Sequence, residues 1–374
     1  MLTIIVFILI LGVLIFVHEL GHFLTARRNG IKAEEFGFGF PPRLLGFIKN
    51  EKTGKFRIVW GSEEVQSRNT VYSLNWIPLG GFVKIKGENG ENKDADSFAS
   101  KGAWTRIKVL AAGVIMNFIL AWVLIAFVLL IGAPEAIDSA QGDFPNSKIQ
   151  ISDVIPDAPA SAMGFQIGDE ILKTQNTQLK FKNVSDVQNY INANRGQQVS
   201  LKIKRGDQDL ELKGVPRLDF PEGQGPLGIS LVETAVVSYP WYQAIWKGLI
   251  SVFDLTLAMI TGLLALLKNI FLGQRVGVDV AGPVGIAVLT KQVTALGLAY
   301  ILQFAAILSI NLGIINAFPF PALDGGRILF VVIEKIKGSP VSHKTEQFFH
   351  SIGFLLLISL MVYITFRDVL KFIK

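Results

Sequence analysis

The chain has 374 residues, of which 50% are hydrophobic and only 18% are charged, with a formal net charge of +6. Its mean hydropathy of +0.44 is too high for an ordinary soluble enzyme and predicts a multi-span membrane protein. Cysteine is absent from the sequence, which excludes disulfides, iron–sulfur clusters and thiolate zinc sites, so any metal must bind His, Asp or Glu. The modest positive charge suits the basic flanks of membrane spans better than a nucleic-acid surface, so we expect no nucleic-acid partner.

The first apolar run, residues 1–26, ends in the motif HELGH. It lacks the basic start and the small-residue cleavage site of a signal peptide, so we expect a retained span. His18 and His22 lie on one helix face, where both can bind one zinc ion, and Glu19 beside them can deprotonate a water held by that metal. Ionisable groups inside a membrane cost about 2.5–3.5 kcal/mol each, so they usually have a function. The alternative is a buried structural histidine pair.

Residues 27–106 are predicted to form a polar, Gly-rich loop. Its stretch EEFGFGFPPRLLGF should lie at the membrane interface rather than form a helix, because glycine and proline interrupt it. The alternation in IPLGGFVKIKGE predicts a strand within a short membrane-associated β-hairpin. The edge of this strand could hold an unwound substrate by main-chain pairing, and a plain structural hairpin is the alternative. The substrate-binding residues predicted here are Gly80, Gly81, Phe82, Val83 and Ile85.

Three more segments are apolar enough to span a bilayer. Lys and Arg residues flank them in a pattern that predicts cytoplasmic loops at 27–106 and 325–346, with the polar segment after the second span outside. If the apolar run at 244–272 crossed the membrane once, the following span would run in the opposite direction and the 325–346 loop would lie outside. We therefore expect that run to be interfacial or re-entrant. A fifth ordinary span is the alternative. The three predicted helices cover 107–132, 298–326 and 347–367, which makes about four transmembrane helices in all.

Residues 145–231 have the pattern of a small β-rich module. IQISDV predicts a strand, and a short Ala-rich helix and a second strand follow, the latter after a turn at Gly168 and Asp169. VSDVQNYINANRG has helical spacing, and the next stretch alternates around an Arg205-Gly206-Asp207 turn, which predicts a hairpin.

The stretch APASAMGF with GDEIL resembles a PDZ domain over about residues 147–231. In the form common in bacterial membrane proteases the peptide-binding loop comes last, and GPLGISL fits that place. One departure is Asn176-Thr177, where such domains usually turn with Asn-Gly. The resemblance implies that a peptide or a C-terminus binds at the loop formed by Leu227, Gly228 and Ile229.

Two histidines leave zinc without a third protein ligand. The stretch NLGIINAFPFPALDGGR offers a carboxylate, because Pro319 and Pro321 stop the preceding helix and Asp324 follows at the predicted cytoplasmic end of that span. The HELGH motif ends at the same level. Two His, one Asp and a water make an open, catalytic type of zinc site. Taken alone, Asp324 would be read as a solvated residue in a glycine turn.

HELGH and NAFPFPALDGG, with IPLGGFVKIKGE between them, resemble the site-2 protease family of intramembrane metalloproteases. The resemblance covers nearly the whole chain, and the PDZ-like segment is similar to that of bacterial members. It implies one zinc ion per chain on His18, His22 and Asp324. It also implies Glu19 as the general base and Asn316 as a substrate or transition-state contact.

A second asparagine, Asn117 of GVIMNF, matches a family asparagine and is expected to bind substrate, although the family's usual proline before it is Val114 here. We therefore expect a multi-span α-helical protein of the bacterial cytoplasmic membrane, with an extracytoplasmic PDZ-like domain and the zinc near the cytoplasmic face.

The resemblance implies an intramembrane zinc endopeptidase that cuts single-span proteins already trimmed outside. Examples of such substrates are anti-sigma factors and signal-peptide remnants, cut in regulated intramembrane proteolysis. An inactive PDZ-bearing scaffold or metal-binding protein is the alternative, and the intact Glu19 disfavours it. A metal transporter is disfavoured because the ionisable residues cluster at one depth.

Overall fold

The computed structural model describes the chain except at residues 1, 51–53, 62, 64, 66, 89–93, 138–146, 175–180, 182, 207, 222, 274–281, 340 and 374. The chain divides into two compact units. The first comprises Met1–Ala126, Ile245–Thr294 and Ile301–Lys374, and the second comprises Phe127–Ala244 and Ala295–Tyr300.

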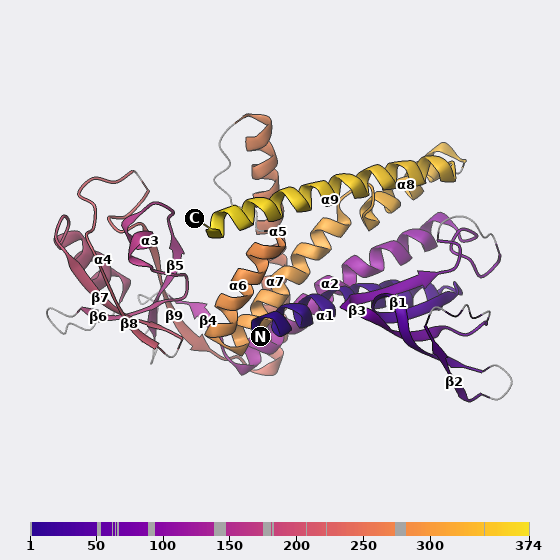
Figure 1. Ribbon diagram of the computed structural model, residues 1–374, viewed down its shortest axis with the longest axis horizontal. Coiled ribbons are helices and arrows are strands. Elements are labelled where there is room, and N and C mark those ends of the chain that lie inside the picture. The colour runs from indigo at the N-terminus through magenta and orange to yellow at the C-terminus, as the bar shows by residue number, and fades with distance from the viewer. Residues whose placement is uncertain are drawn as a thin grey trace. The chain divides into compact units, whose positions relative to one another are not determined.

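In the part of the chain that the structure describes, five helices are long and apolar enough to cross a membrane, which together with two β-sheets identifies a membrane protein with an inserted β-rich part (Figure 1). Three of the four predicted spans each fall on one of these helices. The span predicted over 298–326 is interrupted instead, because its helix ends at Ala317 before Pro319 and Pro321, and a new helix begins at Asp324. The apolar run at 244–272 belongs to the fifth apolar helix, which is continuous. The helices are α1 (Leu2–Arg28), α2 (Ala103–Ile131), α5 (Trp241–Phe271), α7 (Leu298–Ala317) and α9 (His343–Ile373).

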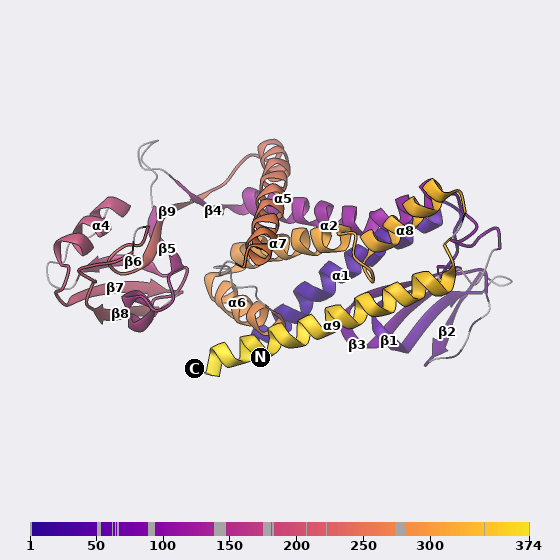
Figure 2. The ribbon, with the colours of Figure 1, turned by 90° about the horizontal axis from the view of Figure 1, so that it is seen from above.

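Small residues let α1, α2 and α7 approach closely (Figure 2). A Cβ atom added at Gly21 would lie only 2.4 Å from the carbonyl oxygen of Ala112, so α1 and α2 touch backbone to backbone there. On the other side of α2, the Ser309 hydroxyl of α7 donates to the carbonyl of Asn117 at 2.8 Å. Because apolar lipid offers little hydrophobic driving force, close packing and buried hydrogen bonds of this kind hold membrane helices together.

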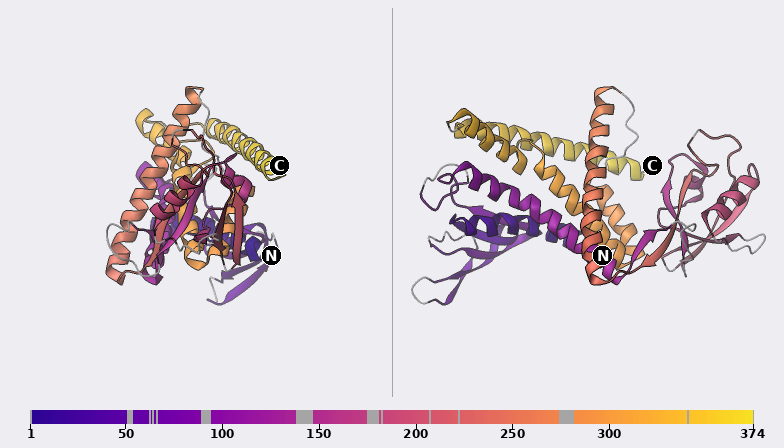
Figure 3. Two further views of the ribbon diagram at one scale, coloured as in Figure 1. Left: turned by 90° about the vertical axis from the view of Figure 1, so that its left-hand side faces the viewer. Right: turned by 180° about the vertical axis from the view of Figure 1, so that it is seen from behind.

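The α5 helix runs across the other long helices rather than alongside them (Figure 3). It touches α2 where Gly248 lies against the backbone of Ala126, and the Trp122 indole N–H donates to the carbonyl of Ile245 at 2.9 Å. Two shorter helices, α6 (Pro283–Leu296) and α8 (Asp324–Lys337), precede and follow α7 in the chain.

A three-stranded sheet with the order β2-β1-β3 packs against α1, which is a larger structure than the predicted hairpin (Figure 1). Its strands are β1 (Ala33–Lys49), β2 (Phe56–Trp60) and β3 (Val71–Ile85), so the stretch expected not to form a helix forms β1. Gly80 has a positive φ of 79°, and an added Cβ would lie 2.6 Å from Ile15. Only glycine fits this approach of β3 to α1 without strain.

The second unit contains a six-stranded sheet with the order β4-β9-β5-β6-β7-β8. The predicted strands, helices and hairpin of this part are confirmed, whereas Asn176-Thr177 lies outside the described residues. The elements are β4 (Ala133–Ala136), β5 (Lys148–Val154), α3 (Pro159–Met163), β6 (Glu170–Thr174), α4 (Val184–Ala193), β7 (Val199–Arg205), β8 (Gln208–Gly214) and β9 (Ile229–Val237).

The core of the second unit combines one face of the sheet with α4. Val187 of α4 and Leu201 and Ile203 of β7 are completely buried in one cluster. The predicted turn residue Asp169 is buried as well, and Arg205 donates to both of its carboxylate oxygens at 2.7 Å. This bidentate pair joins the turn before β6 to the end of β7.

Candidate metal centre and adjoining cavity

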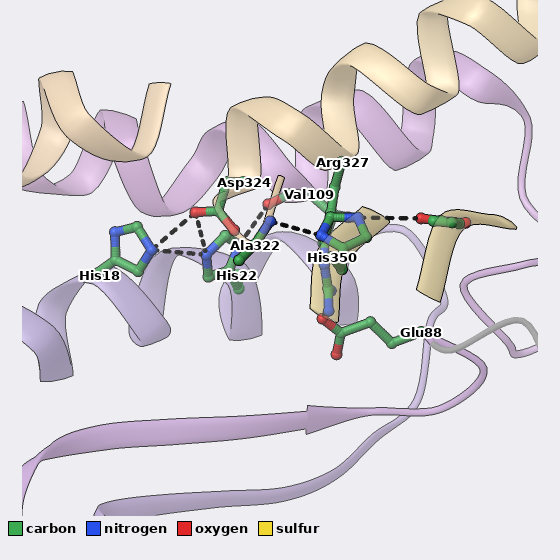
Figure 4. Close-up of polar contacts among 9 residues, drawn as sticks. His18, His22, Glu88, Val109, Ala322, Asp324, Arg327 and His350 are labelled. Atoms are coloured by element: carbon green, nitrogen blue, oxygen red, sulfur yellow. Dashed lines mark hydrogen bonds and ion pairs between the residues drawn. The ribbon is translucent and has the colours of Figure 1, made fainter. Parts of the chain in front are cut away.

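Three potential metal ligands from α1 and α8 meet within 4.8 Å of one another: His18, His22 and Asp324. The Asp324 Oδ2 atom lies 3.0 Å from the Nε2 of His18 and 3.3 Å from the Nε2 of His22, and the two Nε2 atoms are 3.1 Å apart (Figure 4). A tetrahedral ion about 2.0–2.1 Å from each ligand requires ligand atoms roughly 3.3 Å apart. The observed separations therefore fit zinc.

The hydrogen bond at the other ring nitrogen of His22 also supports a zinc site. Its Nδ1 lies 2.8 Å from the carbonyl oxygen of Val109, which can only accept, so Nδ1 carries the proton. In the neutral ring the Nε2 atom is then a bare acceptor, directed at another imidazole nitrogen and a carboxylate. Such converging acceptors suit a cation between them, and the backbone partner fixes the orientation of the ring.

Asn117 of α2 lies beside the Nδ1 of His18, as the Val109 carbonyl lies beside the Nδ1 of His22. It is completely buried, and its amide lies 3.1 Å from the Nδ1 of His18. A half-turn of the amide exchanges its oxygen and nitrogen ends. The oxygen would then accept from Nδ1–H, as a ring that binds metal through Nε2 requires. The structure thus places Asn117 beside the imidazole of a potential metal ligand, and its predicted contact with substrate stays a prediction.

Gly113 leaves the space that the two imidazoles need. A Cβ atom added there would lie 2.4 Å from the Nε2 of His22 and 2.8 Å from the Nε2 of His18. These contacts are far below van der Waals distance, so the rings can adopt their present positions only beside a residue without a side chain. Sequence reasoning missed Gly113, although its spacing before Asn117 on α2 placed it one turn away from a predicted site residue.

A cavity of about 250 Å³ adjoins two of the three potential ligands, His22 and Asp324, and is lined by residues of the first unit. Glu19 and His22 line it from α1, and Asp324 lines it from α8. The predicted substrate strand forms another wall, through Phe82, Val83 and Ile85. Since one water molecule needs roughly 10–15 Å³ by this measure, the cavity can admit several.

An ion pair between Glu88 and Arg327 forms a polar part of the cavity wall. Burial lowers the pKa of the Arg327 guanidinium, but the Glu88 carboxylate outweighs it, so the pKa lies above its ordinary value. The guanidinium is therefore charged beside the carboxylate. The pair connects the segment after β3 with the helix that begins at Asp324.

The remaining predicted residues lie elsewhere. Asn316 is half-buried in the last turn of α7 and is not among the residues that line the cavity. Leu227, Gly228 and Ile229 of the second unit line a separate cavity of about 350 Å³, together with Gln188 and Ile191 of α4.

Comparison with known proteins decides what kind of protein has this site. The model of peptidase family M50 matches residues 6–62 and 53–360. The chain belongs to peptidase family M50, the site-2 proteases. It is a zinc metalloprotease of the site-2 type and an integral membrane protein.

The protease has curated relatives along nearly its full length. A Clostridium perfringens protein assigned as a zinc metalloprotease is 34% identical over 364 residues, which cover 97% of each chain. The regulator of sigma-W protease RasP of Bacillus subtilis is 30% identical, with 98% of each chain covered. The zinc metalloprotease RasP of Geobacillus kaustophilus is 29% identical and covers 99% of this protease and 98% of its own length.

Replacing Gly113 with alanine is expected to abolish zinc binding, because the new methyl group would displace both imidazoles. Zinc content after purification, measured by atomic absorption, checks this. Gly102→Ala is the matched control, since an added Cβ there meets nothing within 4 Å. Equal zinc content in the two variants would contradict the assigned metal centre.

Proposed function

We propose that the protease hydrolyses peptide bonds within membrane-spanning segments of other proteins. The observation that carries the proposal is the shared cavity. Glu19, two of the three converging metal-binding side chains and the edge of β3 all line it, within a unit built from apolar helices. A general base, a metal and a surface for an extended peptide are the parts that such a reaction requires.

His18, His22 and Asp324 would hold one zinc ion. When bound, zinc makes water a stronger nucleophile at neutral pH and polarises the peptide carbonyl. Glu19 faces the same cavity and takes up the proton released from water, then delivers it to the leaving amine. We assign oxyanion stabilisation to the Asn316 amide, and the orientation of His18 to Asn117.

Glu19→Gln should lower cleavage of a model single-span substrate by about 10²–10⁴-fold, because an amide cannot accept the proton. Zinc content should stay that of the parent, since Glu19 is not one of the three converging ligands. The measurement pairs a cleavage assay in detergent micelles with metal analysis of the same preparation. Cleavage at the parental rate would contradict the mechanism.

The edge of β3 is the proposed substrate site. Among the strands that the structure describes, residues 82–85 pair only with β1, so the other side of this segment is available to another strand. A helical substrate hides its amides in internal hydrogen bonds, and pairing with a strand edge would hold an unwound segment extended beside the metal. Gly80 and Gly81 fix this edge by packing on α1.

Proline at Val83 or Ile85 should reduce cleavage at least tenfold without reducing zinc content, because proline removes a backbone N–H group and disturbs the strand. Val83→Thr, which keeps the N–H and a similar shape, is the matched control and should cleave at nearly the parental rate. Unchanged turnover in both proline variants would rule out main-chain pairing at this edge.

We place four helices across the membrane, with the zinc near the cytoplasmic face and the β-rich second unit outside. The support comes from the basic residues that flank the apolar segments and from the position of α5, which lies across the other long helices as an interfacial helix would (Figure 3). The bacterial relatives favour the cytoplasmic membrane as the location.

We infer that the second unit is a PDZ-like domain that limits access. Its 350 Å³ cavity lies between α4 and the segment before β9, where a PDZ domain binds an extended peptide or C-terminus. Outside the membrane, such a domain would clash with a large external substrate domain. The natural substrates would then be single-span proteins trimmed by an earlier cut, such as anti-sigma factors or signal-peptide remnants.

Deleting residues 147–231 should allow the protease to cut a substrate that retains its external domain, because the obstruction is removed. Cleavage of trimmed and untrimmed forms of one substrate, compared between the parent and the deletion variant, measures this. If the variant still cuts only the trimmed form, the domain does not act as a size filter.

A further inference from the structure

The turn that leads to Asp324 contains one strained residue, Ala322, whose backbone N–H bonds to a side chain outside the turn. It joins α7 to α8 and contains Pro319 and Pro321, which have no N–H group to donate. Ala322, two residues before the ligand, has a positive φ of 76°. This left-handed conformation is unfavourable for a residue with a side chain, so the surroundings must enforce it.

The partner of that strained residue comes from the last helix. The Ala322 N–H donates to the Nδ1 of His350 at 2.8 Å, and Figure 4 shows the imidazole of α9 beside the turn. One turn further along α9, a Cβ atom added at Gly353 would lie 2.5 Å from the carbonyl oxygen of Pro321. His350 and Gly353 therefore bring one face of α9 directly against the turn.

The contacts around His350 fix its ring and make Nδ1 the hydrogen-bond acceptor. Since Nδ1 accepts the Ala322 N–H, the proton of the neutral ring is on Nε2, which lies 3.8 Å from the Glu346 carboxylate one turn earlier. The Phe330 ring of α8 packs against the imidazole with 5.5 Å between the ring centroids. The His350 side chain is only 18% exposed, so the ring is held in place as a hydrogen-bond acceptor.

We propose that His350 is a positioning residue for the metal ligand Asp324. It stabilises the left-handed residue that directs the chain into α8, and thereby fixes where the Asp324 carboxylate meets His18 and His22. The last helix would thus complete the metal centre without providing a ligand. This inference rests on the proposed role of Asp324 as a zinc ligand, and zinc affinity tests it separately from catalysis.

The experiment compares His350→Ala with His350→Asn in the full-length protease in detergent. The asparagine amide oxygen can occupy nearly the position of Nδ1 and accept from Ala322, whereas alanine cannot. Loss of a partner that orients a metal ligand weakens metal binding about 10–100-fold. Competition with a chromogenic chelator should therefore show at least tenfold weaker zinc binding in the alanine variant and near-parental binding in the asparagine variant.

Two further variants make the result specific. Phe348→Ala removes a ring of the same helix that is 61% exposed, and should leave zinc affinity unchanged. Gly353→Ala should weaken zinc binding, because its methyl group would push Pro321 away, and it tests the same contact if His350→Ala does not fold. Gel filtration and thermal unfolding establish that each variant compared is folded.

Parental zinc affinity in folded His350→Ala would overturn the inference, as would an asparagine variant that binds zinc as weakly as the alanine variant. A parent protein that binds no zinc would overturn it as well. A parent protein that binds zinc but cleaves no membrane segment would contradict the proposed function alone. The zinc affinities of the variants would still decide whether His350 positions Asp324.

Discussion

The convergence of one carboxylate oxygen and two imidazole nitrogens at about 3 Å is the constraint on which the protease depends. Asp324 and the histidines lie far apart in the sequence, so the helices that carry them must be positioned accurately by their packing. Added Cβ atoms at Gly325 and Gly326 would lie 2.3 Å and 2.2 Å from carbonyl oxygens of the preceding segment. These glycines let α8 begin directly against the end of α7, as Gly21 lets α1 meet α2.

The same arrangement explains how hydrolysis can occur in an apolar helix bundle. His18 lies about 24 Å along α1 from its start, near one edge of a hydrocarbon core roughly 30 Å thick. The cavity lined by His22 and Asp324 has polar walls at Glu88 and Arg327, which can form hydrogen bonds with water. The proposed orientation would place this polar side toward the cytoplasm. The metal would then remain within the bundle while water reaches it from one side.

Much of the metal centre could be predicted from the sequence because its chemistry is local or restrictive. HELGH sets its own geometry on one helix, and the lack of cysteine limits the third ligand to a few residue types. The strand at Phe82–Ile85 followed from alternation. The pairing of β1 with both halves of β3 did not, because strand partners depend on contacts between distant segments.

The residues that support the ligands were harder to find. Gly113 has no chemistry of its own, and its role appears only when α1 lies against α2. His350 did offer a signal, since an ionisable residue in an apolar segment usually has a function. Its hydrogen-bond partner is the backbone N–H of Ala322, and a sequence pattern does not indicate which backbone group a side chain will contact. Asn117 was recognised as a site residue, but only the structure shows which group its amide contacts.

Metal binding at this site would be coupled to helix assembly. The three potential ligands come from α1 and α8, so the free energy of zinc binding to them would also favour the packing of these helices, as in other proteins whose metal site forms only on folding. The ligand turn is held in addition by α9 through His350 and by the segment after β3 through Glu88 and Arg327. A displacement of β3 would therefore be transmitted to the helix that begins at Asp324 through one ion pair. The position of the Asp324 carboxylate thus depends on α9, through His350 and Gly353, and on the segment after β3, because both hold the chain around it.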